Sequence, residues 1–375
     1  MADREPGRRG LRWSLAILAI ALVWLLASVT PAPFAIERPG PVVDALGEVD
    51  LAGGDEGAEG DGGETAVIVI DGAETFETSG ELNVLSVAII GSPESPVSWM
   101  QLLGALLDPT RTIVPIGQLY PEGVTTDDRV AAGAAMMQSS QHRAVAAALR
   151  ELGEPVEARL RVASVVPDGP SDGALREDDV LLAVDGEPIA TMERLREMLA
   201  ADPGAPLALL VSRDGAQLEV EVEPVAPEPG TAPLLGVTIA IEYGFPFEVE
   251  VYLGDIGGPS AGAMLALAVY DRLTPGGMTG GLRISGTGTI DDEGRIGPIG
   301  GLQQKLWGAS LAGTDLFLVP IGNCADLPER IPDGMAVAPV ATLREAIDAV
   351  EEAAAGRTPP GPERCSAGEF VRSSD

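Results

Sequence analysis

A run without any charged side chain, from Trp13 to Val29, is the strongest constraint on how this 375-residue chain folds. At about 17 residues it lies at the short end of what a membrane-spanning helix needs. Four arginines precede it, so the positive-inside rule predicts a cytoplasmic segment at 1–12, a transmembrane anchor at 13–30 and export of the remainder. A signal peptide cleaved near Ala35 is the alternative interpretation, and it exports the remainder as well.

Composition narrows the class of protein. The length suggests two or three domains, and 45% apolar residues with 22% charged residues indicate globular ones. A net charge of -33 argues against nucleic acid as a partner, because phosphates need Lys and Arg. Two cysteines suit neither a disulfide-dense scaffold nor a four-thiolate zinc site, and we expect no metal and no cofactor. Because export permits disulfides, Cys324 and Cys365 are predicted to form one that holds the C-terminal tail, with two free thiols as the alternative.

The order of strand-like and helix-like segments predicts an α+β multidomain protein. An acidic, glycine-rich stretch from Gly53 to Glu64 is interpreted as a solvated loop, with calcium binding as the alternative. A proline-rich linker spans 224–230. The predicted domains are a β-rich N-terminal region with a helix (36–152), a compact β unit (153–225), an α/β domain (231–355) and a C-terminal tail (356–375).

Ser260 lies in Gly258-Pro-Ser-Ala-Gly262, at the start of a predicted helix. Free backbone N–H groups and the helix dipole at such a position favour an alkoxide or an oxyanion. A structural N-cap serine is the common alternative. The pentapeptide also fits G-x-S-x-G of α/β-hydrolases, but that family needs a later histidine, and the only histidine is His142.

Lys305 is the only lysine among 24 basic residues. At helical spacing it shares an apolar face with Leu302, Leu306 and Ala309. Burial on that face disfavours the ammonium and lowers the pKa toward the range of a useful base. Arginine cannot replace such a lysine because it stays protonated. The sequence therefore predicts a Ser260–Lys305 pair, in which the lysine takes the place of a histidine.

Residues 166–189 resemble a bacterial PDZ domain, which implies a PDZ-like fold for 153–225 and binding of an extended peptide as an added strand. Asp178 stands where that family usually has glycine. The loop that holds the peptide carboxylate in the family is not located in the sequence.

Four motifs in order resemble the proteolytic domain of Lon proteases, and the whole resembles membrane-anchored PDZ–Lon-like proteins of bacteria. The resemblance implies that Ser260 is the nucleophile, that Lys305 is the general base and that Thr279 orients the lysine amine. Backbone N–H groups at Gly258 and Ser260 would bind the oxyanion. Lon proper often has Asp at the position of Gly257, which leaves open whether Asp255 contributes. The motifs are Asp255–Gly262, Leu273–Gly281, Gly286–Ile290 and Gly297–Lys305.

The predicted function is an ATP-independent serine endopeptidase that cleaves extracytoplasmic proteins or peptides. No G-x-x-x-x-G-K-[ST] motif occurs, so no nucleotide partner is expected. The substrate is expected to pair with an edge strand near 247–253, and the resemblance implies a homo-oligomer. The alternative is a PDZ-based binding or scaffold protein whose protease domain is degenerate.

Overall fold

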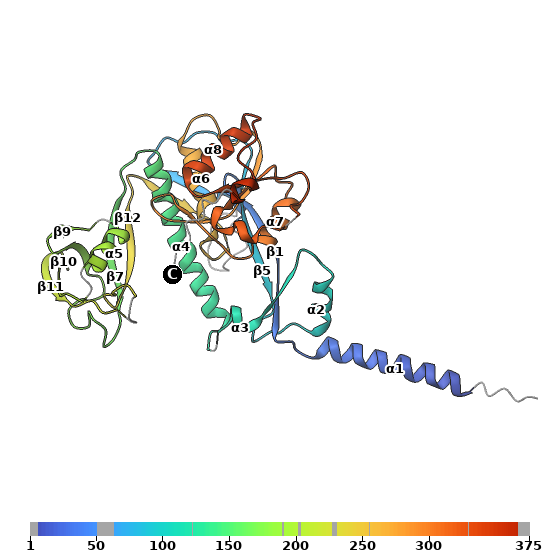
Figure 1. Cartoon of the computed structure of the whole chain (residues 1–375). Coiled ribbons are helices and arrows are strands. Elements are labelled where there is room, and N and C mark those ends of the chain that lie inside the picture. The colour runs from blue at the N-terminus through green and yellow to red at the C-terminus, as the bar shows by residue number, and fades with distance from the viewer. Residues whose placement is uncertain are drawn as a thin grey trace, which may run out of the picture. The chain divides into compact units, whose positions relative to one another are not determined.

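The computed structural model describes residues 7–50, 64–121, 123–189, 191–201, 204–226, 231–254, 256–328 and 330–366. Asp255 and nearly all of the glycine-rich segment predicted as a solvated loop lie outside these residues. The chain divides into two compact units (Figure 1). The first combines Met1–Gly153 with Phe247–Asp375, and the second is Glu154–Pro246.

A six-stranded mixed sheet forms the centre of the first unit, in the order β18-β17-β14-β5-β1-β6. β14, β17 and β18 are parallel to one another and β14 is parallel to β5, whereas β1 runs antiparallel to β5 and β6. Every residue of β17 is buried, as expected for a central parallel strand. The strands are β1 (Phe34–Asp44), β5 (Glu81–Ile90), β6 (Thr112–Pro115), β14 (Arg283–Gly286), β17 (Leu316–Pro320) and β18 (Ala336–Val340).

Helices and short β-pairs complete this unit. β13 (Glu248–Val251) pairs with β4 (Ile68–Asp71), β2 (Glu48–Asp50) with β3 (Glu64–Ala66), and β15 (Thr289–Ile290) with β16 (Ile296–Gly297). The helices are α1 (Gly7–Val29), α2 (Trp99–Leu106), α3 (Ile116–Leu119), α4 (Thr126–Glu151), α6 (Gly262–Leu273), α7 (Leu302–Leu311) and α8 (Leu343–Ala354), with 3₁₀ turns η2 (Pro259–Ala261), η3 (Ile321–Asp326) and η4 (Pro362–Ser366).

The domain boundaries drawn from the sequence need correction, because residues 36–152 are not a separate domain. β1, β5 and β6 come from this region, yet they share one sheet with β14, β17 and β18. The junction is parallel, with Leu82 of β5 opposite Ile284 of β14. A linear sequence does not show that strands about 200 residues apart will pair.

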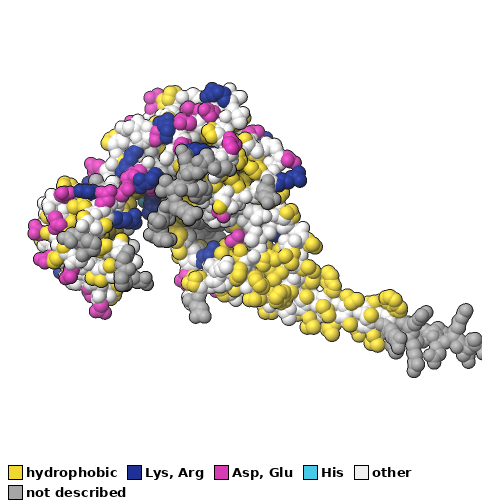
Figure 2. All heavy atoms as spheres, viewed as in Figure 1, with side chains coloured by type: hydrophobic (Ala, Val, Ile, Leu, Met, Phe, Trp, Pro, Cys, Tyr) yellow, Lys and Arg dark blue, Asp and Glu magenta, His cyan; other side chains and the backbone are white. Residues whose placement is uncertain are grey.

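The structure does not support the membrane span predicted over residues 13–30. Among the described residues, no helix has both the length and the apolar content needed to cross a bilayer. Helix α1 covers this stretch, and each of its large apolar side chains from Trp13 to Val29 is at least 50% exposed. Figure 2 shows these hydrophobic side chains gathered along α1.

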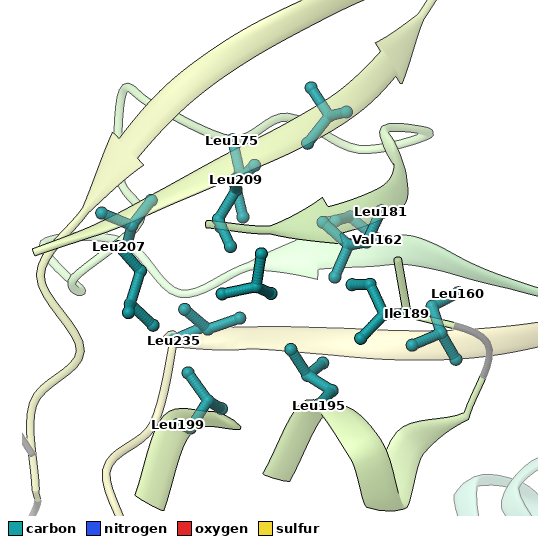
Figure 3. Close-up of a cluster of buried hydrophobic side chains, with 13 residues drawn as sticks. Leu160, Val162, Leu175, Leu181, Ile189, Leu195, Leu199, Leu207, Leu209 and Leu235 are labelled. Carbon is teal, nitrogen blue, oxygen red and sulfur yellow. The ribbon is translucent and has the colours of Figure 1, made fainter. Parts of the chain in front are cut away.

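The second unit is built on the sheet β11-β10-β8-β7-β12. Leu195 and Leu199 of its helix pack together with the strand residues Leu160 and Leu209 and with Leu235, which lies just before β12 (Figure 3). The elements are β7 (Glu157–Val165), β8 (Val180–Val184), β9 (Glu187–Pro188), α5 (Met192–Ala201), β10 (Leu207–Arg213), β11 (Ala216–Val222) and β12 (Val237–Gly244).

Strand β12 corrects the predicted end of the PDZ-like domain at residue 225. It lies beyond the predicted linker, but it pairs antiparallel with β7, with Ile241 opposite Leu160. Its apolar side chains, including Ile239 and Ile241, pack on the core of this unit. The strand therefore belongs to the second unit, not to the domain predicted over 231–355.

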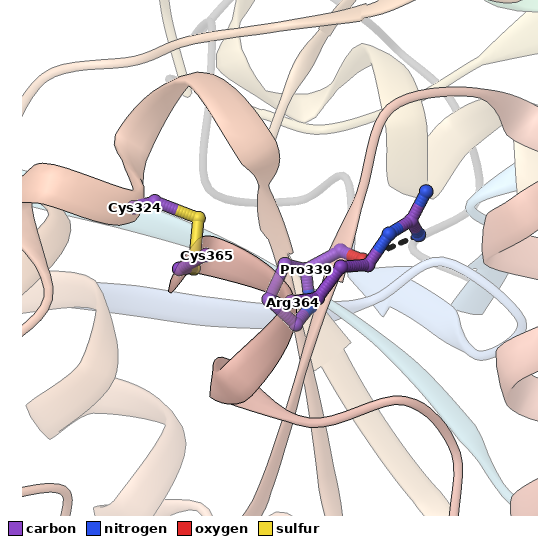
Figure 4. The surroundings of a disulfide bond; sticks show 4 residues. All are labelled: Cys324, Pro339, Arg364 and Cys365. Carbon is purple, nitrogen blue, oxygen red and sulfur yellow. Dashed lines mark hydrogen bonds between the residues drawn. A yellow bond between two sulfur atoms is a disulfide. The ribbon is translucent and has the colours of Figure 1, made fainter. Parts of the chain in front are cut away.

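The C-terminal segment is fixed to the first unit by a covalent bond. Cys324 of η3 and Cys365 of η4 form a disulfide (Figure 4). Next to it, the Arg364 guanidinium donates a hydrogen bond of 3.1 Å to the carbonyl oxygen of Pro339 on β18. The pairing predicted from the sequence is thus present in the structure.

Candidate active site

Ser260 lies in the turn η2, immediately before α6. Gly258 enters this turn with a φ of 88°, a conformation that favours glycine. The Ser260 carbonyl oxygen accepts two hydrogen bonds, from the Gly288 N–H at 2.9 Å and from the Thr287 hydroxyl at 3.0 Å. The serine is therefore held at a helix start, where the first N–H groups have no helical acceptor.

Lys305 reaches the serine from helix α7. Its amine nitrogen Nζ lies 2.6 Å from Ser260 Oγ, and the residue is only 2% exposed. Leu302, Leu306 and Ala309 are buried with it, which confirms the apolar face expected from the helical spacing. No acidic side chain is among the causes that set its pKa. Burial alone lowers the pKa of the Lys305 amine to about 8.

Thr287, not Thr279, is the threonine beside the lysine amine. Thr287 Oγ1 lies 2.9 Å from Lys305 Nζ. The hydroxyl of Thr279 instead donates to the carbonyl oxygen of Ser79 and is fully buried there. The orienting role predicted for Thr279 is therefore wrong for this structure. Thr287 lies in Gly286-Thr-Gly-Thr-Ile290, one of the four Lon-like motifs, and nothing in the sequence of this motif indicates which of its threonines faces the lysine.

The Thr287 hydroxyl has two partners with different requirements. It donates its proton to the Ser260 carbonyl oxygen, so its lone pairs are left to accept a hydrogen bond from Lys305 Nζ. An amine that donates one N–H to Thr287 can direct its lone pair toward Ser260 Oγ. One threonine thus fixes both the backbone of the serine and the orientation of the lysine.

Gly258 also departs from its predicted role. Its N–H donates to the carbonyl oxygen of Gly133 on α4 at 2.9 Å, so it is not directed at an incoming oxyanion. The N–H groups of Ser260 and Ala261 are the first of the turn that starts at Pro259. The backbone N–H of Ser260 therefore remains a candidate oxyanion donor. The second candidate is the N–H of Ala261, not that of Gly258.

A cleft opens at the Ser260–Lys305 pair. Two adjoining pockets of about 740 and 1040 Å³ share Val87, Ile89 and Ile256 among their lining residues. β14 pairs with β5 only as far as Val84, so no described strand covers that edge of β5 from residue 85 onward. The later part of β5 lines the cleft, which leaves an open strand edge next to the pair. β13 is the strand that was expected from the sequence to pair with the substrate, and in the structure it pairs with β4. Leu253, two residues after β13, lines the cleft.

Two protein-family models match this chain, one in each of its two compact units. Residues 254–352 match the Lon protease (S16) C-terminal proteolytic domain. Residues 161–213 match the PDZ domain. The chain therefore combines a PDZ domain with a Lon-type proteolytic domain.

Individual relatives match over shorter stretches. The Lon protease of Lachnoclostridium phytofermentans is 40% identical over 93 residues, which are 24% of this chain and 11% of that protein. The pro-apoptotic serine protease nma111 of Aspergillus clavatus is 46% identical over 70 residues, 18% of this chain and 7% of that protein. The chain thus spans only a small part of these relatives. The crystal structure of the PDZ domain of the SdrC-like protein from Listeria monocytogenes is 17% identical and covers 21% of this chain and 85% of its own, with a TM-score of 0.20.

Proposed function

We propose that this protein is a serine endopeptidase whose reaction uses Ser260 and Lys305 and needs no ATP. The observation that carries the proposal is the 2.6 Å contact between Ser260 Oγ and the amine of a buried lysine whose pKa is lowered to about 8. This contact lies in a domain of the Lon proteolytic type. A lysine that loses its proton near neutral pH can act as the general base that a serine nucleophile requires.

The reaction is acyl transfer. Neutral Lys305 takes the proton from Ser260 Oγ as that oxygen attacks the peptide carbonyl carbon. The oxyanion that forms is held by the N–H groups of Ser260 and Ala261, each worth about 10²–10³ in rate. Lys305, now an ammonium, gives its proton to the leaving amine as the C–N bond breaks. Water, activated by the same lysine, then hydrolyses the ester on Ser260.

The open edge of β5 is the proposed binding strand for the substrate. An extended peptide can hydrogen-bond to a free strand edge, and alternate side chains then enter pockets on either side. Leu253, Ile256 and Ile89 give the cleft an apolar lining, and Glu37 and Arg129 are the charged residues of the first pocket besides Lys305. We therefore propose unfolded or extended segments with apolar side chains as substrates.

The PDZ domain offers a second strand edge for peptide. β12 ends its sheet and is bonded on one side only, to β7. Addition of a peptide strand to such an edge is the general mode of PDZ recognition. We propose that β12 takes a peptide segment of the substrate or of an adaptor protein.

The lysine count supports the proposed independence from ATP. The P-loop of ATPases, G-x-x-x-x-G-K-[ST], contains a lysine, and the only lysine of this sequence is Lys305, which is buried beside Ser260. We expect the purified protein to cleave peptides at the same rate with and without ATP and Mg²⁺.

We propose that the protease acts outside the cytoplasm, attached to a membrane by residues 13–30. The Cys324–Cys365 disulfide supports an oxidising compartment. The exposed apolar side chains of α1 support contact with lipid. Assembly into a homo-oligomer stays a prediction, which light scattering of the purified protein would measure.

Labelling with a fluorophosphonate tests the proposal. Wild-type protein should be labelled at Ser260 and should cleave a casein-type unfolded substrate. Ser260→Ala should lose both properties and keep its circular dichroism spectrum. Ser310→Ala, on α7 but away from the cleft lining, is the control and should behave as wild type. Cleavage by Ser260→Ala at a rate near wild type would disprove the assignment.

A further inference from the structure

Helix α4 contacts the nucleophile loop at two points on the N-terminal side of Ser260. The carbonyl oxygen of Gly133 accepts the Gly258 N–H at 2.9 Å. Seven residues, or about two helical turns, further on, the Ser140 hydroxyl donates to the carbonyl oxygen of Pro259 at 3.0 Å. Ser140 is only 3% exposed, so water cannot readily replace its hydroxyl in this bond.

The helix lies so close to the chain around Ser260 that a side chain at Gly257 or Gly262 would crowd it. A Cβ added to Gly257 would lie 3.3 Å from the carbonyl carbon of Gly133. A Cβ added to Gly262 would lie 2.8 Å from Ser140 Oγ. The contact is therefore made by backbone and a single short hydroxyl, which leaves little room for the loop to shift.

The loop depends on such outside contacts because its own hydrogen bonds are few. η2 has only three residues, and its closing bond runs from the Gly262 N–H to the Pro259 carbonyl oxygen. The Ser140 hydroxyl shares that same carbonyl oxygen. On the other side of Ser260, Thr287 and Gly288 hold the serine carbonyl oxygen. Ser260 thus lies between two sets of contacts, one from α4 and one from the segment after β14.

We propose that α4 positions the nucleophile, with Ser140 as the positioning residue that holds the Pro259 carbonyl and so sets the distance between Ser260 Oγ and Lys305 Nζ. This inference rests on the proposed peptidase function. Residues 133 and 140 lie outside the matched proteolytic domain, which begins at residue 254. A segment that precedes the PDZ domain in the chain therefore completes the catalytic arrangement that follows it.

The test compares Ser140→Ala with Ser139→Ala in the full chain. Ser139 is the exposed neighbour on the same helix and serves as the matched control. Because Ser140→Ala removes one hydrogen bond next to the nucleophile, kcat should fall by at least about fivefold, while KM stays within about twofold. The rate of fluorophosphonate labelling should fall by the same factor as kcat. Ser139→Ala should match wild type in kcat, KM and labelling rate.

A merely structural serine would give another pattern. If Ser140→Ala lowers the melting temperature but keeps wild-type kcat and labelling per folded molecule, the positioning role is disproved. Gly257→Ala tests the same contact from the loop side and decides the question if Ser140→Ala does not fold. It should lower kcat as well, because its new Cβ pushes the loop away from Gly133.

Ser260→Ala, measured in the same assay, separates failure of this inference from failure of the proposed function. If Ser260→Ala is inactive and Ser140→Ala has the kcat and labelling rate of wild type, the peptidase assignment is supported and the positioning role is disproved. If Ser260→Ala keeps its activity, both are overturned.

Discussion

The amine of Lys305 contacts the hydroxyl of Ser260 at 2.6 Å inside an apolar environment, and no histidine takes part. A hydrogen bond of this length places the lysine within direct proton-transfer distance of the serine. Burial supplies what a solvated lysine lacks, a pKa of about 8 in place of 10.5. Lys305 is the only lysine of the chain, and the proposed role as base is one that arginine cannot fill.

Replacement of Lys305 by arginine should be as damaging as replacement by alanine. The guanidinium stays protonated at any workable pH, so it cannot accept the proton of Ser260. We expect kcat/KM to fall by about 10²–10⁴-fold in both variants, measured with a fluorogenic peptide. Substantial activity in Lys305→Arg would show that the lysine only supplies charge or packing.

The dependence of kcat/KM on pH should follow the deprotonation of the Lys305 amine. The active form is the neutral amine, so kcat/KM should rise about tenfold per pH unit at low pH and level off above about pH 8. His142→Ala should leave this profile in place. A profile whose inflection disappears in His142→Ala would assign the base to the histidine and contradict the lysine mechanism.

The contact between Ser260 and Lys305 could be predicted from the sequence because each residue has a local signal. A serine between glycines at a helix start and a lone lysine on an apolar helix face can be recognised without tertiary structure. Thr287 and Thr279 offer no such distinction, since both are threonines in glycine-rich segments and both are buried. Which hydroxyl faces the lysine depends on where the chain passes after β14, and that is set by the sheet.

The errors in domain organisation have the same origin. β12 follows a proline-rich segment that is typical of a linker, and only its pairing with β7 shows that it belongs to the second unit. The bond from Gly258 to Gly133 joins residues more than 100 positions apart, and no sequence pattern near Gly258 indicates it. Long-range backbone hydrogen bonds of this kind leave little trace in a single sequence.

Substitution of the two buried threonines should separate their roles. Thr287→Val removes the hydroxyl between Lys305 Nζ and the Ser260 carbonyl oxygen, so kcat should fall by about tenfold or more. Thr279→Val leaves the Ser79 carbonyl oxygen without its donor and should lower the free energy of unfolding by about 1–3 kcal/mol. Its activity per folded molecule should stay near wild type. The opposite pattern would restore the lysine-orienting role to Thr279.

The disulfide should stabilise the protease unit without entering the chemistry. Cys324 and Cys365 are separated by 41 residues, and a link across a loop of that size typically contributes about 2–4 kcal/mol. Cys324→Ser and Cys365→Ser should lose this stability equally, because each removes the same bond. Thiol titration of the denatured, unreduced wild-type protein should find no free thiol, and two free thiols would exclude the disulfide.

Lys305→Met should make the protein inactive and more stable. Unfolding returns the lysine to its ordinary pKa of 10.5, whereas the folded state holds it at about 8. Below about pH 8 the amine is protonated in both states, and the folded state bears the full cost of a buried ammonium. Between about pH 8 and pH 10.5 the unfolded state binds more protons than the folded state, so wild-type stability from this group rises with pH.

The difference in the free energy of unfolding between Lys305→Met and wild type should therefore depend on pH. A shift from 10.5 to about 8 corresponds to roughly 3 kcal/mol, so Lys305→Met should exceed wild type by up to that amount at pH 7. The gap should shrink steadily as the pH is raised from 8 toward 10.5, because the amine is then neutral in the folded state but still protonated in the unfolded state. Above about pH 10.5 the amine is neutral in both states, and the gap should stop changing. Urea unfolding of both proteins at several pH values measures this gap. A constant gap would mean that the amine is not desolvated in the folded protein, and the physical basis for lysine as the base would be lost.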